Sequence, residues 1–197
     1  MLQSLIKSGV VVVVASLWSM VASAGTITCG NQYRTATLTS AELCGIGSGN
    51  TKESDIESYF GGDWVHLGGI AGSDGTAGTL VNGYLTLTLL NGVWGSPGPI
   101  SGTWAIDSSF WTVYGKAALS IHVGNGKYDP DHFAWYISEG NTSGTWSYQH
   151  MPKGGGGGLS NMHLWGSGEP AVQVSEPNLA LLLILGLLSM FVARRRV

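Results

Sequence analysis

The chain has 197 residues, of which 11% are charged and 31 are glycine, whereas globular domains usually have about 25% charged residues and about 7% glycine. Four of the nine basic residues lie in the two terminal segments described below, while all twelve acidic residues lie between Glu42 and Glu176. The part between those segments is therefore acidic. An acidic surface excludes nucleic acid as a partner, because binding to phosphates requires basic patches.

The first 24 residues have the three parts of a secretory signal peptide. Lys7 supplies a charged start, residues 10–18 are mostly apolar, and Ala22-Ser23-Ala24 is a cleavage site of the A-x-A type. An uncleaved N-terminal anchor is the alternative, but small residues at this distance from the apolar run favour cleavage. We therefore expect residues 1–24 to be a leader and residues 25–170 to form one exported domain.

Cys29 and Cys44 are the two cysteines of the chain. In an exported protein such a pair predicts a disulfide, which contributes about 3 kcal/mol when it closes a loop of this length. The alternatives are a free pair of thiols and a metal site, and a metal site requires more ligands than two thiols.

Between the terminal segments, the sequence consists mainly of short runs of β-branched and aromatic residues that end at glycine, asparagine, aspartate or proline. Residues 84–89 alternate strictly, which places leucines on one face of a strand and Thr86 and Thr88 on the other. Residues 51–60 are the exception and predict a short amphipathic helix. The pattern predicts an all-β fold, a β-sandwich or jelly-roll. The expected strands are Tyr33–Leu38, Trp64–Ile70, Tyr84–Leu90, Gly102–Ile106, Ala117–Val123, Phe133–Ser138, Gly144–Tyr148 and Met162–Trp165.

Two aromatic residues are candidates for binding carbohydrate, since flat aromatic faces pack against sugar rings. Trp94 and Trp111 lie beside turns and are expected to be exposed. The other strand tryptophans are expected in the core, because a sandwich of this size can bury several indoles.

A weak candidate for a calcium site is the pair Asp129 and Asp131, which flank Pro130. Calcium prefers several oxygen ligands, which two carboxylates and nearby carbonyls can supply. A solvated turn has the same composition and is the interpretation we favour. We otherwise expect no metal and no cofactor.

Catalytic motifs are absent from the sequence. It has no H-x-H pair, no metalloprotease helix and no G-x-S-x-G elbow. We expect no catalytic residues, with a secreted hydrolase as the less favoured alternative. His122 alternates with Ile121 and Val123, which predicts that its side chain points away from the core.

The C-terminal segment, residues 171–197, combines a short polar motif, an apolar run and a basic end. Ser175-Glu176-Pro177 precedes the apolar residues 179–193, and Arg194, Arg195 and Arg196 follow them. A helix over residues 179–193 extends roughly 22 Å, less than the ~30 Å of a hydrocarbon core. The arginines are expected to hold the C-terminus in the cytoplasm. The alternative to a sorting signal is an ordinary membrane anchor.

This tail resembles that of the PEP-CTERM proteins, which end in a Pro-Glu-Pro motif, a transmembrane helix and an arginine cluster. Glu176 and Pro177 match the motif, and Ser175 stands where the family has its first proline. The resemblance implies processing by an exosortase in a Gram-negative bacterium that makes exopolysaccharide. The protein would first lie in the inner membrane and then reach the cell surface or the extracellular matrix.

The sequence thus predicts an exported surface or matrix protein associated with exopolysaccharide or biofilm. Its expected partners are an exosortase-type enzyme, the membrane and the exopolysaccharide. A carbohydrate-binding module is the alternative, in which Trp94 and Trp111 would contact the sugar.

Overall fold

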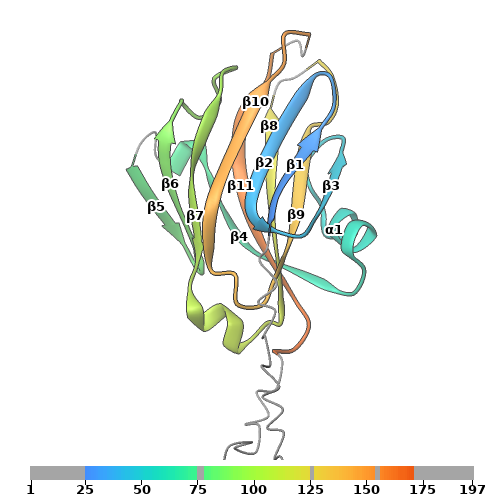
Figure 1. Ribbon diagram of the computed structural model, residues 1–197, viewed down its shortest axis with the longest axis vertical. Helices are drawn as coiled ribbons and strands as arrows, with labels where there is room; N and C mark the ends of the chain where they lie inside the picture. The colour runs from blue at the N-terminus through green and yellow to red at the C-terminus, as the bar shows by residue number, and fades with distance from the viewer. Residues whose placement is uncertain (1–24, 75–77, 125–126, 154–155, 171–197) are drawn as a thin grey trace, which may run out of the picture.

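The computed structural model describes residues 25–74, 78–124, 127–153 and 156–170, and these ranges are mostly β-strand. The strands form two antiparallel sheets that lie one behind the other (Figure 1). The six-stranded sheet has the order β1 (Gly25–Gly30), β2 (Arg34–Ala41), β10 (Ser143–His150), β7 (Ile100–Ile106), β6 (Leu85–Asn91) and β5 (Gly78–Asn82). The five-stranded sheet has the order β3 (Leu43–Gly47), β9 (His132–Ser138), β8 (Lys116–Gly124), β11 (Gly158–Ser167) and β4 (Trp64–Ala71).

The core lies between the two sheets and is built by alternation. In β7, Ile100, Gly102, Trp104 and Ile106 are buried, while the three residues that alternate with them are partly exposed. The same core cluster contains Leu119 and Phe133 from the five-stranded sheet. Burial of this apolar surface, at about 25 cal/mol per Å², is the main force that holds the sheets together. The prediction of an all-β fold is confirmed.

All eight expected strands are present, and the tryptophans expected in the core are buried. The structure adds three strands that the sequence pattern did not reveal, namely β1, β3 and β5. All three lie at an edge of their sheet. The tryptophans expected in the core are Trp104, Trp135, Trp146 and Trp165, and Trp64 at the start of β4 is buried as well.

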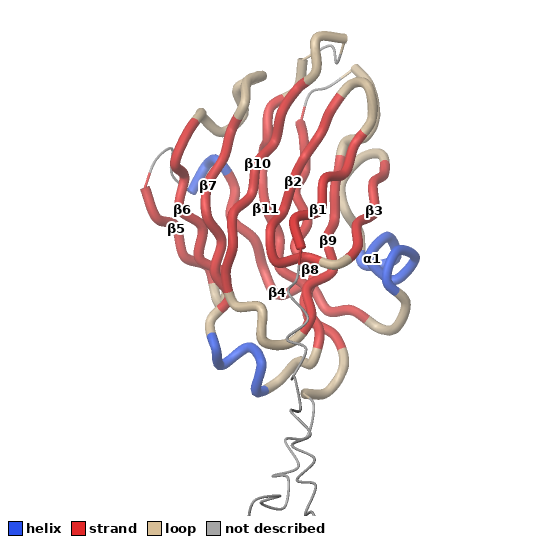
Figure 2. The backbone as a smooth tube through the Cα atoms, viewed as in Figure 1, coloured by secondary structure: helices blue, strands red, loops and turns tan. Residues whose placement is uncertain are grey.

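The expected helix is also present as α1 (Glu53–Phe60), which lies beside β3 (Figure 2). Its Ile56 is fully buried in a small cluster with Ala118 and Ala134 on the outer face of the five-stranded sheet. Its Tyr59 ring lies against Gly45 of β3, where a Cβ atom would collide with the ring. Small residues on this face therefore make room for the helix.

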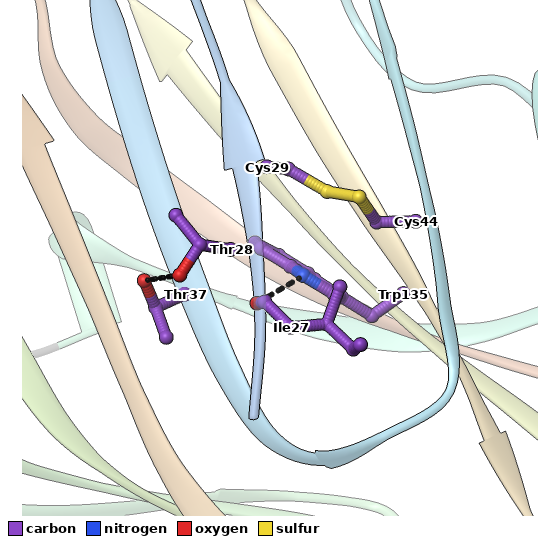
Figure 3. Close-up of a disulfide and its surroundings, with 6 residues drawn as sticks. All are labelled: Ile27, Thr28, Cys29, Thr37, Cys44 and Trp135. Atoms are coloured by element: carbon purple, nitrogen blue, oxygen red, sulfur yellow. Dashed lines mark hydrogen bonds between the residues drawn. A yellow bond between two sulfur atoms is a disulfide. The ribbon is translucent and has the colours of Figure 1, made fainter. Parts of the chain in front are cut away.

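A disulfide joins Cys29 of β1 to Cys44 of β3, with 6.3 Å between the two Cα atoms. The bond connects the edge strand of one sheet to the edge strand of the other (Figure 3). Trp135 lies beside it, and its indole N–H donates to the carbonyl oxygen of Ile27 at 3.2 Å. The predicted disulfide is confirmed, and it closes one side of the two-sheet body.

The first strand, β1, begins at the same end of the body at which the last strand, β11, ends. In the strand registers Gly25 faces Ala41, and the chain passes from there through Glu42 directly into β3. Across the five-stranded sheet, that end of β3 aligns with the start of β8 and with Ser167 at the end of β11. A segment before residue 25 and a segment after residue 170 are therefore joined to the same end. None of the helices in the described ranges combines the length and the apolar character that a membrane span requires.

Candidate functional site

The residues of the predicted sorting signal lie outside the described part of the chain. This applies to Ser175, Glu176 and Pro177, to the apolar residues 179–193, and to Arg194, Arg195 and Arg196. It also applies to the leader, residues 1–24. These predictions remain expectations from the sequence.

The expectation that Trp94 and Trp111 are exposed is wrong. Only 8% of Trp94 and 9% of Trp111 is accessible to solvent. The ring of Trp94 packs 5.7 Å from that of Trp146, and Trp111, in the 3-10 turn Ser108–Thr112, packs 4.8 Å from Phe110. Both turns lie at the surface, but their indoles fold back over the ends of the core. Neither ring offers a free face to a sugar.

Asp131 forms an ion pair with Arg34. Its carboxylate lies 2.9 Å from the guanidinium of Arg34, which is completely buried, and accepts a hydrogen bond of 3.0 Å from the amide of Gly49. Burial opposes ionisation of Asp131, but the Gly49 amide and the Arg34 charge outweigh it and lower the pKa. Asp129 is exposed, and its main-chain oxygen accepts from Asn31 at 2.9 Å. These contacts favour the turn over the calcium site.

The outer face of the six-stranded sheet is covered with hydroxyl groups. Ten of the fourteen threonines of the chain lie at outward positions of its strands, and we call this surface the threonine face. Three serines, Gln149, Asn91, Ala105, Leu90, Val81 and Gly30 occupy the remaining outward positions. The threonines are Thr26, Thr28, Thr35, Thr37, Thr39, Thr79, Thr86, Thr88, Thr103 and Thr145, and the serines are Ser101, Ser143 and Ser147.

The strand registers align these side chains in rows across the sheet. One row contains a threonine from every strand, in the order Thr26, Thr39, Thr145, Thr103, Thr88 and Thr79. Hydroxyls of neighbouring strands touch: Thr28 and Thr37 are 2.9 Å apart (Figure 3), as are Thr79 and Thr88. The outward positions of these six strands carry no charged and no aromatic side chain.

The outer face of the five-stranded sheet is different, since its strands contain no threonine and it carries four histidines. His66 and His163 lie with Nε2 and Nδ1 2.8 Å apart, and the ring of His66 packs 4.8 Å from that of Trp165. His122 contacts the hydroxyl of Ser160 at 2.8 Å. Its side chain is partly exposed while Ile121 and Val123 are buried, so its predicted orientation is confirmed.

The fourth histidine, His132, is fixed by its neighbours. Its Nδ1 lies 3.0 Å from the carbonyl oxygen of Gly49, so the ring donates there, and Nε2 accepts from the hydroxyl of Tyr59 at 2.9 Å. Tyr59 belongs to α1, and this bond therefore also ties the helix to the sheet.

Burial keeps two of these imidazoles neutral near pH 7. It lowers the pKa of His163 to about 4, with repulsion from His66 and His122 adding to the effect. Burial also lowers the pKa of His122, against an opposing attraction from Asp131. Within the described ranges, no three side chains of the metal-binding types converge as a metal site would require. On this face, His163 and His122 can therefore bind protons at acidic pH.

The hydroxyl of Ser160 is directed at the backbone. It donates to the main-chain oxygen of His122 at 3.0 Å, while the ring of the same histidine contacts it from the side. A serine nucleophile needs its proton to point at a base. The Ser160–His122 pair therefore has the geometry of a contact between strands.

Comparisons with protein-family models, with curated proteins and with solved structures returned no match for the chain. The resemblance of the tail to PEP-CTERM proteins therefore rests on the residues of the tail alone.

The sequence contains a signal for the threonine face that is not a catalytic or binding motif. Residues 35–39 read Thr-Ala-Thr-Leu-Thr, and residues 26–28 and 86–88 each place two threonines on one side of a strand. Alternation identifies the face within a strand, but it does not show that six such strands are neighbours.

Proposed function

We propose that the protein is an exported surface or extracellular-matrix protein that an exosortase-type enzyme sorts in a Gram-negative bacterium. The leader with Ala22-Ser23-Ala24 supports export, and the tail with Glu176-Pro177 and three arginines supports sorting. The disulfide between Cys29 and Cys44 fits an oxidising compartment. Association with exopolysaccharide or biofilm is part of this proposal, because the family resemblance implies it.

The observation in the folded body that supports the proposal best is the position of its ends. Gly25 and Ser167 share one end of the sheets. A tail that follows Pro170 would hold the body by that end alone. Both outer faces, including the threonine face, would then remain free for contacts outside the cell.

The finer description of the domain as a jelly-roll-like β-sandwich belongs to the same proposal. The face-to-face packing of two antiparallel sheets around one core supports it. A carbohydrate-binding module that uses Trp94 and Trp111 has less support, because both indoles are buried.

The topology is tested by fusing alkaline phosphatase after Gly168 and, in a second strain, after Val197. The enzyme is active only outside the cytoplasm, so the first fusion should be active and the second inactive. The opposite pattern would refute export with a cytoplasmic C-terminus.

Sorting is tested in the same host with tail variants of the unfused chain. Replacing Glu176 and Pro177 together by alanine should leave full-length protein in the inner membrane, and Ser175→Pro should increase the shortened surface product. Gln173→Ala is the matched control and should behave like the wild type. Equal ratios of precursor to product in all four proteins would mean that the tail is only an anchor.

A further inference from the structure

The threonine face is a regular array in two dimensions. Within one strand, threonines at every second residue repeat at about 6.8 Å, and neighbouring strands lie about 4.8 Å apart. Thr35, Thr37 and Thr39 give the first repeat in β2, and the row through Thr145 and Thr103 gives the second. The array is therefore suited to a partner that is itself periodic.

The side chains in the array are held in fixed orientations. Threonine is branched at Cβ, so its χ1 angle has few allowed values in a strand, and each residue presents a hydroxyl beside a methyl group. Contacts between hydroxyls restrict the rotamers further, at Thr28 with Thr37 and at Thr79 with Thr88. Thr39 is fixed by the amide of Thr145, which donates to its hydroxyl at 2.7 Å. The face thus requires little ordering when it binds.

The composition of the face excludes several classes of partner. With no charge at its outward positions, it offers nothing to nucleic acid or to an anionic polymer. With no aromatic ring, and with only Gln149 and Asn91 as planar polar groups, it lacks the flat apolar faces that pack against sugars. What remains is a partner that is neutral, periodic and rich in hydroxyl-type hydrogen bonds.

Ice, in which water molecules form a neutral and periodic lattice, meets these conditions. The methyl groups favour ordered water around them, and each hydroxyl can donate one hydrogen bond and accept two. Charged side chains would instead hold their own hydration water, at a cost if it is displaced. The repeat distances of the threonine residues along and across the strands, about 6.8 Å and about 4.8 Å, are close to distances that recur between oxygen atoms on an ice surface. We propose that the threonine face binds ice.

General β-propensity does not account for the array. Threonine is favoured in strands, so propensity alone would place it on both sheets. The five strands of the second sheet contain none, although some of their outward residues are exposed, such as Leu43 of β3 and His66 of β4. Threonine is thus concentrated on one face of the molecule.

The contact is centred on the middle of the sheet. Adjacent strands rotate by about 20° relative to each other, so the match to a flat lattice holds over neighbouring strands and weakens toward the edges. The central strands β10 and β7 carry Thr145 and Thr103, which face each other in the register. Thr103 is therefore the position at which a bulky charged side chain should weaken binding to ice most.

The test uses the full chain in a mild detergent, present at equal concentration in every sample. Adsorption to growing polycrystalline ice and inhibition of ice recrystallisation are measured for the wild type, Thr103→Lys and Val65→Lys. Val65 is 51% exposed on the opposite sheet and is the matched control. We expect Thr103→Lys to weaken adsorption by about tenfold, since a loss of about 1.4 kcal/mol has that effect, with Val65→Lys unchanged. Urea unfolding verifies that both variants remain folded.

Three results would overturn the proposal. The first is adsorption of the wild type no greater than that of an unrelated protein in the same detergent. The second is equal adsorption of Thr103→Lys and Val65→Lys while both are folded. The third is retention of the wild type on a neutral polysaccharide or in a dimer that covers the threonine face, without any effect on ice. None of these measurements depends on the sorting tail, so the two proposals can fail separately.

Discussion

Replacing Arg34 by methionine should strongly destabilise the fold. The Arg34 side chain is completely buried, and its guanidinium donates to the carbonyl oxygen of Pro130 at 2.8 Å, to the carboxylate of Asp131 at 2.9 Å and to the carbonyl oxygen of Gly156 at 3.3 Å. It thus connects the start of β2 to the β8–β9 and β10–β11 connections. Methionine keeps most of the apolar stem and removes all three bonds.

The magnitude follows from what the substitution leaves behind. Breaking a buried ion pair by removing one partner costs about 3–5 kcal/mol. Asp131 is 26% exposed and keeps its bond from Gly49, so water can partly hydrate the orphaned carboxylate. We therefore expect a loss at the lower end, about 3 kcal/mol, from the free energy of unfolding.

The assay is urea unfolding at pH 7, with Asp131→Asn and the double variant measured beside Arg34→Met. The folded-state pKa of Asp131 is lowered, so the ion pair contributes fully at pH 7 and is lost only as the pH falls through that pKa. The double variant should be more stable than the sum of the two single losses predicts, by about 2 kcal/mol. A loss below about 1 kcal/mol for Arg34→Met, or strict additivity, would refute the reasoning.

Two further predictions concern the disulfide and the histidines. Because Cys29 and Cys44 are 15 residues apart, changing both to serine should lower the free energy of unfolding by about 3 kcal/mol. A reducing agent should destabilise the wild type equally and leave the variant unchanged; a wild type insensitive to reductant would contradict this. Unfolded His163 binds a proton below about pH 6.5, whereas in the folded protein its pKa is about 4. Stability should therefore fall by on the order of 1 kcal/mol as the pH decreases through this window, after allowance for solvent screening. His163→Gln should lack this part of the loss, and an identical pH profile would disprove the assignment.

The sequence predicted the inner strands better than the edges. Alternation in residues 84–89 and apolar runs such as 117–123 record burial, which is strongest in the middle of a sheet. β3 contains Gly45 and Gly47, whose small size serves the packing of Tyr59 and His132, so it shows no strand pattern. β5 has little buried surface. Contacts made by a distant helix cannot be read from local alternation.

The direction of side chains at turns is the second feature that the sequence did not predict. Trp94 and Trp111 stand beside glycine, proline and serine, and these neighbours indicate correctly that the backbone lies at the surface. They do not tell where a large ring points from there. In the structure, Trp94 packs over Gly72, where a Cβ atom would collide with it. The threonine face escaped recognition for a related reason, because the order of strands in a sheet is a property of the whole fold.

The position of β11 has a mechanical consequence. β11 lies between β8 and β4, and its last residue, Ser167, is at the end of the body that a tail would hold. A pull on Ser167 along the strand acts against both ladders at once, because their hydrogen bonds run perpendicular to the strand. All of these bonds must then shear together, whereas an edge strand pulled sideways would unzip one bond at a time. A body held in this way would resist drag from flowing water better than one held through β1 or β5.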